Sequence, residues 1–151
     1  METSTSKWDR RFLELATLVA TWSKDRSTKV GAVVVGPDRE VRSLGYNGFP
    51  RGVSDDIEER HERPEKYNWV EHAERNSVYN ASRFGASLKG CTLYCTHPPC
   101  TDCGRAIIQA GITSVVVRRV TGEMIDRWEK NLETAASMIM EAGCTYRQVA
   151  L

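Results

Sequence analysis

Two short stretches of the chain carry side chains that bind transition metals. One is His72-Ala73-Glu74, and the other is Pro99-Cys100-Thr101-Asp102-Cys103. Imidazole nitrogen and thiolate sulfur are zinc ligands, and a catalytic zinc site has three protein ligands and one open position for water. His72, Cys100 and Cys103 supply three such ligands, and two thiolates balance the two positive charges of the ion. The pattern therefore predicts one catalytic Zn²⁺ ion held by these side chains.

A carboxylate follows the histidine at short spacing. Glu74 lies two residues after His72, near the metal without having to bind it, which is where a proton shuttle for water is needed. Zinc in a protein site lowers the pKa of water from ~9 toward ~7. We expect Glu74 to be the catalytic residue. Both motifs stand at predicted helix starts, where the helix dipole favours thiolate over thiol.

Each motif alone has an ordinary explanation. A single histidine is more often structural or exposed than a ligand, and a Cys-x-x-Cys pair is equally a redox pair or half of a structural zinc site. Redox chemistry gives no role to His-Ala-Glu, however, and a structural zinc site needs a fourth ligand. Cys91 and Cys95 lie in an apolar segment, where a free cysteine is usually a small core residue. The combination favours catalytic zinc.

The composition excludes several classes of protein. The 151 residues contain 21 Lys and Arg against 20 Asp and Glu, and 40% are hydrophobic. A net charge of +1 provides no field for holding nucleic acid, and the hydrophobic content excludes a disordered chain. No run approaches ~20 apolar residues, and the N-terminus has no signal-peptide core. Five cysteines, an odd number, argue against a disulfide framework. We expect one domain over residues 1–151 in a soluble, cytoplasmic protein with no membrane or nucleic-acid partner.

Hydrophobic periodicity and turn residues predict alternating helices and strands. Ser6 and Asp9 have the spacing of a capping box. Gly36-Pro37-Asp38 is a turn that joins two strands as a hairpin. The predicted helices cover residues 7–23, 71–84, 100–110 and 124–142. The predicted strands cover residues 30–35, 40–46, 91–96, 113–118 and 144–149. The fold class is α/β, a three-layer α-β-α sandwich with a mixed sheet of about five strands, in which helical crossovers favour parallel neighbours. Residues 47–69 are predicted to be a long functional or mobile loop.

Several segments resemble one enzyme family. His-x-Glu with Pro-Cys-x-x-Cys is the signature of zinc deaminases, but it alone fits cytidine, guanine, riboflavin-pathway and tRNA adenosine deaminases. Residues 25–32 (DRSTKVGA) and 45–52 (GYNGFPRG) are more specific, and residues 87–94 and 107–112 add to them. With these, the chain resembles the deoxycytidylate (dCMP) deaminase family, which has the cytidine deaminase-like fold. Arg26 stands where many relatives have proline.

The resemblance implies a reaction and roles for particular residues. It implies hydrolytic deamination of dCMP to dUMP and ammonia, which supplies dUMP for thymidylate synthesis. His72, Cys100 and Cys103 would hold zinc, whose hydroxide attacks C4 of the base. Glu74 would carry the proton to N3 and then to the leaving amine. Asn47 would bind the sugar and the pyrimidine edge, and the main-chain N–H of Ala73 would contact the base.

The phosphate of the substrate requires cations or N–H donors. Arg26, Ser27, Thr28 and Lys29 form a polar group before the first strand, and we expect Arg26, Thr28 and Lys29 to bind substrate there. The alternative is a capped loop with solvated charges. For the aromatic residue that covers the base, Trp69, Phe49 and Tyr46 are unranked candidates.

The resemblance also implies regulation and assembly. Related enzymes are activated by dCTP and inhibited by dTTP, with Mg²⁺, and are commonly hexameric, so a homo-oligomer is expected. The charged loop, residues 51–68, is either such a site or a solvated surface. Apolar residues also lie along one side of the last helix, explained by core packing at least as well as by a subunit interface: Met124, Trp128, Leu132, Ala135, Ala136 and Ile139.

Three other functions stay open. The first is deamination of another cytosine substrate, dCTP or deoxycytidine. The second is deamination of a base in nucleic acid, against which the near-zero net charge argues. The third is a non-catalytic zinc module, in which Glu74 would have no use.

Overall fold

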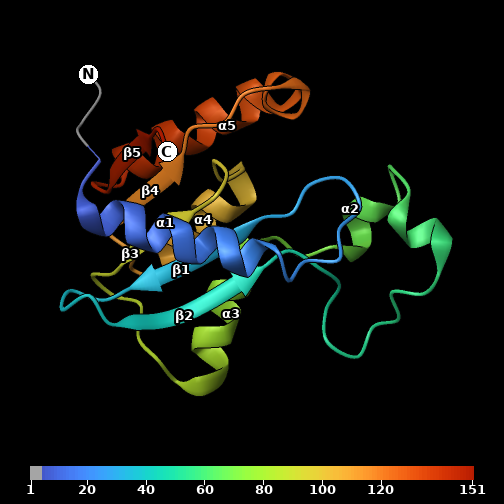
Figure 1. The fold of residues 1–151 in the computed structure, drawn as a ribbon, viewed down its shortest axis with the longest axis horizontal. Helices are drawn as coiled ribbons and strands as arrows, with labels where there is room; N and C mark the ends of the chain where they lie inside the picture. The colour runs from blue at the N-terminus through green and yellow to red at the C-terminus, as the bar shows by residue number, and fades with distance from the viewer. Residues whose placement is uncertain (1–4) are drawn as a thin grey trace.

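The computed structural model describes residues 5–151, with helices and strands that alternate along most of the chain (Figure 1). The long helices are α1 (Lys7–Ala20), α3 (Ala73–Phe84), α4 (Thr101–Gln109) and α5 (Glu123–Glu141). The strands are β1 (Gly31–Val35), β2 (Val41–Tyr46), β3 (Thr92–Cys95), β4 (Ser114–Arg118) and β5 (Thr145–Val149). The predicted order of elements is confirmed, with ends that differ by a few residues.

The strands form one mixed sheet in the order β2-β1-β3-β4-β5. Strands β3, β4 and β5 are parallel, as their helical connections require. Strand β1 is antiparallel to both of its neighbours, β2 and β3. The expectation that helical crossovers join parallel neighbours is therefore wrong at one place. Helix α3 connects β2 to β3, which point the same way but are separated by β1.

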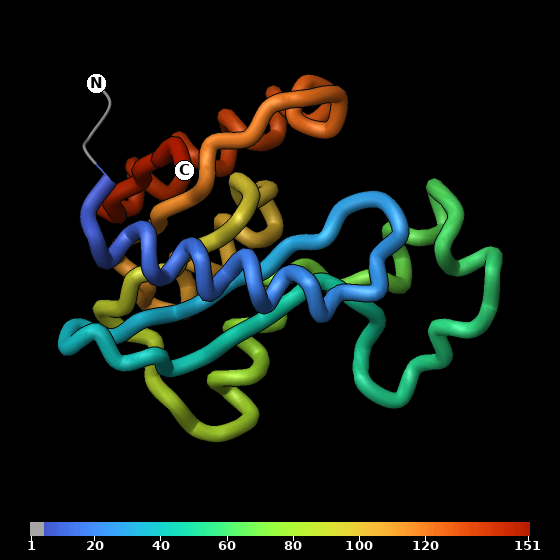
Figure 2. The backbone as a smooth tube through the Cα atoms, viewed as in Figure 1, coloured from blue at the N-terminus to red at the C-terminus, as the bar shows by residue number. Residues whose placement is uncertain are grey.

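Helices cover both faces of the sheet, which confirms the three-layer sandwich. Helix α1 lies alone on one face, where its buried Phe12, Leu13, Ala16 and Val19 pack with Val33 of β1 and other strand residues. Figure 2 shows its tube crossing in front of the strands. On the other face of the sheet, buried residues of α3, α4 and α5 pack in a second core cluster against the strand side chains that point away from α1.

Helix α1 is also anchored by a buried carboxylate. The capping box is present, because Ser6 accepts from the N–H of Asp9 and the Asp9 side chain accepts from the N–H of Ser6. Asp9 accepts two further bonds from Arg147 of β5, at 2.9 and 3.0 Å. Burial acts to raise the pKa of Asp9, but the bonds from Arg147 and Ser6 outweigh it and hold the pKa below its usual value. The contact ties the first helix to the last strand.

The predicted loop of residues 47–69 contains two single-turn helices that the sequence did not indicate. They are the 3-10 helix η1 (Glu58–His61) and the α-helix α2 (Lys66–Trp69). Neither contains a buried residue, which explains why hydrophobic periodicity gives no sign of them. In Figure 2 this green segment projects beyond the end of the sheet.

Helix α3 packs directly on the backbone of β2. A Cβ atom built at Gly45 would lie far inside contact distance of the carbonyl oxygen of Ala73 and the amide nitrogen of Ser77. Only glycine therefore allows this approach, which fixes the first turn of α3 against the sheet. Within residues 5–151, no helix combines the length and hydropathy needed to cross a bilayer.

We predict that Gly45→Ala lowers the free energy of unfolding by about 1–3 kcal/mol, because an added methyl group must push the helix off the strand. Urea unfolding measures the change. Gly48→Ala is the matched control, since a Cβ there meets nothing within 4 Å. Equal stability of the two variants would contradict the close contact.

Candidate metal centre and active site

Three potential metal ligands converge where two helices begin. His72 is the N-cap of α3, Cys100 is the N-cap of α4, and Cys103 lies in the first turn of α4. One ligand atom of each lies within 4.8 Å of the others. Nδ1 of His72 is 3.4 Å from Sγ of Cys100 and 3.5 Å from Sγ of Cys103. The fold thus brings together side chains that are 28 and 31 residues apart.

These separations fit zinc. With Zn–S bonds of ~2.3 Å and a Zn–N bond of ~2.0 Å in a tetrahedron, the nitrogen and each sulfur stand about 3.5 Å apart. The observed values, 3.4 and 3.5 Å, match this geometry. The remaining cysteines are Cys91 and Cys95, both buried in the core, and Cys144, and none belongs to the cluster. The donor set therefore has three protein ligands, the number in a catalytic site.

The two thiols need a cation to ionise together. The neighbouring Cys103, helped by His72, lowers the pKa of Cys100 to about 4. The same neighbour, together with burial and Glu74, raises the pKa of Cys103 far above its usual value. The pKa of His72 is raised, chiefly by its hydrogen bond to Cys100. One sulfur is thus a thiolate and the other keeps its proton unless a positive ion replaces that proton.

A buried carboxylate lies against the cluster. Glu74 is 4% exposed, and its Oε2 lies 3.3 Å from Sγ of Cys103. Its other oxygen, Oε1, accepts a hydrogen bond from the thiol of Cys95 at 3.2 Å. Burial and Glu74 raise the pKa of Cys95 well above its usual value, so this thiol stays a donor. Sequence reasoning treated Cys95 as a core residue and missed this contact, which depends on the packing of β3 against α3.

Charged residues cross-link the starts of the two helices. Arg75 of α3 lies 2.5 Å from Oε1 of Glu71 and 3.4 Å from Oδ2 of Asp102 in α4. Glu71 also accepts from the N–H of His72 at 2.9 Å. Burial acts to lower the pKa of Arg75, but the negative charge shared by the pair Cys103 and Cys100 and the hydrogen bond to Glu71 outweigh it and raise the pKa. The bridge holds the two ligand-bearing turns together.

A cavity of about 150 Å³ lies over the cluster. Its wall contains His72, Cys100, Glu74 and Ala73, the last of which is buried at the first position of α3. The predicted substrate residues Asn47 and Thr28 line it as well. Several further lining residues were not assigned to the substrate site from the sequence, among them Arg63, Lys66, Tyr67, His97, Trp128 and Leu132.

The C-terminal helix contributes to this wall through its apolar stripe. Met124, Trp128 and Leu132 line the cavity, whereas Ala135 and Ile139 continue the same stripe into the core. Trp128 meets Tyr67 of α2 edge to face, with ring centroids 6.1 Å apart. The spacing along the helix was visible in the sequence, but it did not distinguish core packing from a site.

Asn47 is buried at the junction between the cavity and the sheet. Its Oδ1 accepts from the N–H of Val30, and its Nδ2 donates to the carbonyl of Thr28, both at 2.8 Å. These bonds fix the orientation of the amide. Each side-chain atom retains one further hydrogen-bonding position, and the residue lines the cavity.

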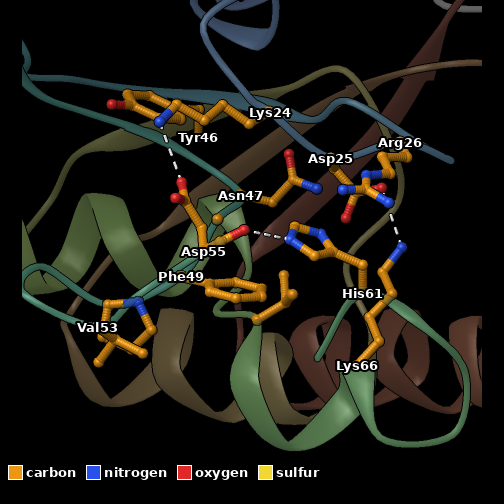
Figure 3. Close-up of a pocket in the computed structure, with 13 residues that line it drawn as sticks. Lys24, Asp25, Arg26, Tyr46, Asn47, Phe49, Val53, Asp55, His61 and Lys66 are labelled. Atoms are coloured by element: carbon orange, nitrogen blue, oxygen red, sulfur yellow. Dashed lines mark hydrogen bonds and ion pairs between the residues drawn. The ribbon is translucent and has the colours of Figure 1, made fainter. Parts of the chain in front are cut away.

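A second cavity of about 230 Å³ adjoins the first (Figure 3). The two share Asp25, Asn47, Lys66 and Val70 as lining residues. Arg26 lines only the second cavity and pairs with Glu58 at 2.5 Å. In Figure 3, Phe49 and His61 lie together near the centre, with ring centroids 5.0 Å apart.

Other candidates from the sequence lie away from the metal ligands. Lys29 is exposed and lines neither cavity. Of the aromatic candidates, Phe49 and Tyr46 line only the second cavity. Trp69 lines neither, and its ring is covered by Arg60 at 3.8 Å. Tyr67 and Trp128 are the aromatic residues that line the same cavity as Glu74.

Comparison with known proteins identifies this arrangement. The family model for the cytidine and deoxycytidylate deaminase zinc-binding region matches residues 6–119, which include all three ligands and Glu74. The chain belongs to the cytidine and deoxycytidylate deaminase family. It is therefore a zinc-dependent deaminase, which is a hydrolase.

Individual members of this family are similar over most of the chain. A protein of Aliivibrio fischeri described as an uncharacterized deaminase in the luxG 3′ region is 43% identical over 138 residues, covering 91% of this chain and 90% of the relative. The deoxycytidylate deaminase of Mus musculus is 37% identical over 149 residues, covering 94% and 79%. The dCMP deaminase of cyanophage S-TIM5, solved with dCMP and dUMP, has a TM-score of 0.77 at 25% identity, covering 97% and 100%.

A buried ion pair supports the wall that both cavities share. Nζ of Lys66 lies 2.9 Å from Oδ1 of Asp25, and the side chains are 12% and 4% exposed. Asp25 also accepts from the N–H groups of Ser27 and Thr28. Burial acts to raise the pKa of Asp25, but these bonds and Lys66 outweigh it and lower the pKa. The pair attaches α2 to the segment that precedes β1.

We predict that Lys66→Met lowers the free energy of unfolding by about 3 kcal/mol at pH 7, because Asp25 would be buried without its cation. Since the folded pKa of Asp25 is below the ordinary ~3.9, the stabilisation is present above that pH and is lost as pH falls through the folded pKa. The difference between wild type and variant should therefore shrink in acid. Lys24→Met, which removes an exposed pair with Asp55, is the control. Equal losses for both variants would contradict the prediction.

Proposed function

We propose that the protein hydrolyses dCMP to dUMP and ammonia. The observation that carries the proposal is the buried carboxylate of Glu74 beside a His, Cys, Cys cluster of zinc geometry, at the wall of a cavity. The substrate follows from relatives named deoxycytidylate deaminase and from the phage enzyme solved with dCMP and dUMP. The specific segment GYNGFPRG supports the same substrate.

The proposed roles divide among the residues of the cavity. His72, Cys100 and Cys103 would hold the zinc ion. When bound, zinc supplies a Lewis acid that makes water a nucleophile near neutral pH. Glu74 accepts a proton from the water that adds to C4 of the base and delivers it to N3. Glu74 then takes the second proton of that water to the amine, the C4–N bond breaks, and ammonia leaves.

Other residues would hold the substrate in position. Asn47 retains a donor and an acceptor position for the sugar or the pyrimidine edge, and the main-chain N–H of Ala73 stands at a helix start, where no intrahelical acceptor exists. Thr28 lines the same cavity. The rings of Tyr67 and Trp128 supply apolar surface that excludes water from the base. Arg26 and Lys29 remain predictions as phosphate contacts.

We also propose that dCTP and dTTP act as effectors in the second cavity. Its wall carries the cations Lys24 and Arg26, and its shared lining residues connect it to the catalytic cavity. Within residues 5–151, the cluster with metal-ligand spacing is the His, Cys, Cys group, so Mg²⁺ would arrive with the nucleotide. The test is the rate of dCMP deamination as a function of dCMP concentration, measured with and without dCTP or dTTP. Rate curves that neither nucleotide changes would contradict the proposal. We further propose a homo-oligomer, for which the family resemblance implies a hexamer, and light scattering measures its mass.

The main experiment measures ammonia release by the zinc-loaded protein with dCMP, dCTP, deoxycytidine and single-stranded DNA. We expect turnover of dCMP to exceed that of the other three. Preference for dCTP or deoxycytidine would support deamination of another cytosine substrate, and preference for DNA would support a nucleic-acid deaminase.

Glu74→Gln in the same assay tests the role of the carboxylate. We expect a loss of about 10²- to 10⁴-fold in kcat, the usual contribution of a general acid–base group, with the zinc content unchanged. Glu133→Gln is the control, because Glu133 is exposed on α5. Full activity of the Glu74 variant would overturn the mechanism.

A further inference from the structure

We propose that Arg63 binds the 5′-phosphate of the substrate and sets the preference for the nucleotide over the nucleoside. This inference rests on the proposed function and goes beyond it, because neither the sequence motifs nor the comparisons assign a role to Arg63.

Arg63 is the lining cation that has no counter-ion. Of the charged groups around the cavity, Lys66 is paired with Asp25 at 2.9 Å with both side chains nearly buried. Glu74 accepts from Cys95. Burial, with Arg118 nearby, lowers the pKa of His97, so its ring is neutral near pH 7. Within residues 5–151, no hydrogen bond or ion pair of the Arg63 side chain is found, although this residue lines the cavity.

The position of Arg63 suits the outer end of a nucleotide. Glu74 and Ala73 are buried at one part of the wall, with exposed fractions of 4% and 0%, whereas Arg63 and Tyr67 are exposed. A base whose C4 must reach Glu74 enters first, so the sugar and phosphate remain toward solvent. A guanidinium carries a planar fork of donors that binds phosphate with two parallel hydrogen bonds.

The other cations near the cavities are less suitable. Arg26 lines the second cavity but not the catalytic one, and it already pairs with Glu58. Lys29 lines neither cavity. Lys66 lines the catalytic cavity, but releasing it would leave Asp25 as a buried, unpaired charge. Of the Arg and Lys residues that line the catalytic cavity within residues 5–151, Arg63 offers a positive charge without breaking an ion pair such as that of Lys66 with Asp25.

The test compares kcat/KM of the zinc-loaded holoenzyme for dCMP and for deoxycytidine. We expect Arg63→Gln to reduce kcat/KM for dCMP by about 10- to 100-fold, the usual effect of losing a charge-assisted hydrogen bond, and to leave deoxycytidine unchanged. Arg63→Lys should recover part of the loss, because it restores the charge without the fork. Arg83→Gln, at the far end of α3 from Glu74, is the matched control, since Arg83 is exposed and lines neither cavity.

Calorimetric binding of dUMP and deoxyuridine gives a second measurement that does not depend on turnover. Arg63→Gln should weaken binding of dUMP only. The proposal is overturned if the variant keeps the wild-type preference for dCMP, if both substrates lose equally, or if Arg26→Gln with Lys29→Gln produces the selective loss instead. Failure of the wild type to deaminate any of the substrates would overturn the proposed function itself, which separates the two results.

Discussion

Two helices begin side by side at one end of the sheet, and their N-caps and first turns carry all three candidate zinc ligands. The geometry of the rest of the site depends on this close placement of the starts of α3 and α4. Helix α3 is placed by the close approach of its backbone to Gly45, and α4 follows directly after β3. The bridge from Glu71 through Arg75 to Asp102 then holds the two turns together. The ligand geometry is thus set mainly by backbone packing, so binding zinc requires little rearrangement.

Several groups that can carry negative charge lie close together at the candidate metal centre. Two sulfurs and the carboxylate of Glu74 lie within a few bond lengths of one another. The helix starts and Arg75 offset part of this charge, and a divalent cation bound by the cluster would offset the remainder. Cys95 adds a neutral donor to the carboxylate without adding charge. One oxygen of the buried Glu74 is therefore satisfied by the thiol of Cys95.

The sequence predicted the fold class, the hairpin, the capping box and the residues that meet at the metal centre, because each of these depends on local spacing or on a short motif. It did not predict helix α2, the position of Arg63 and Tyr67 in the wall of the catalytic cavity, or the contact of Cys95 with Glu74. These depend on how distant segments pack. The apolar stripe on α5 was recognised, but periodicity alone does not tell which of its turns face a cavity. Only the first part of the stripe, from Met124 to Leu132, lines the cavity, and the later part packs in the core.

The segment between β2 and α3 differs from the rest of the molecule in how few of its residues are buried. Its two single-turn helices contain no buried residue, yet it lines both cavities. Apart from Asn47 and Lys66, whose side chains are buried or nearly buried, substitutions in its helical turns meet fewer packing constraints than those in the sheet and the long helices. Evolution can therefore alter what enters the cavity while the hydrolytic centre is inherited intact, and relatives with different substrates are expected to diverge most in this segment.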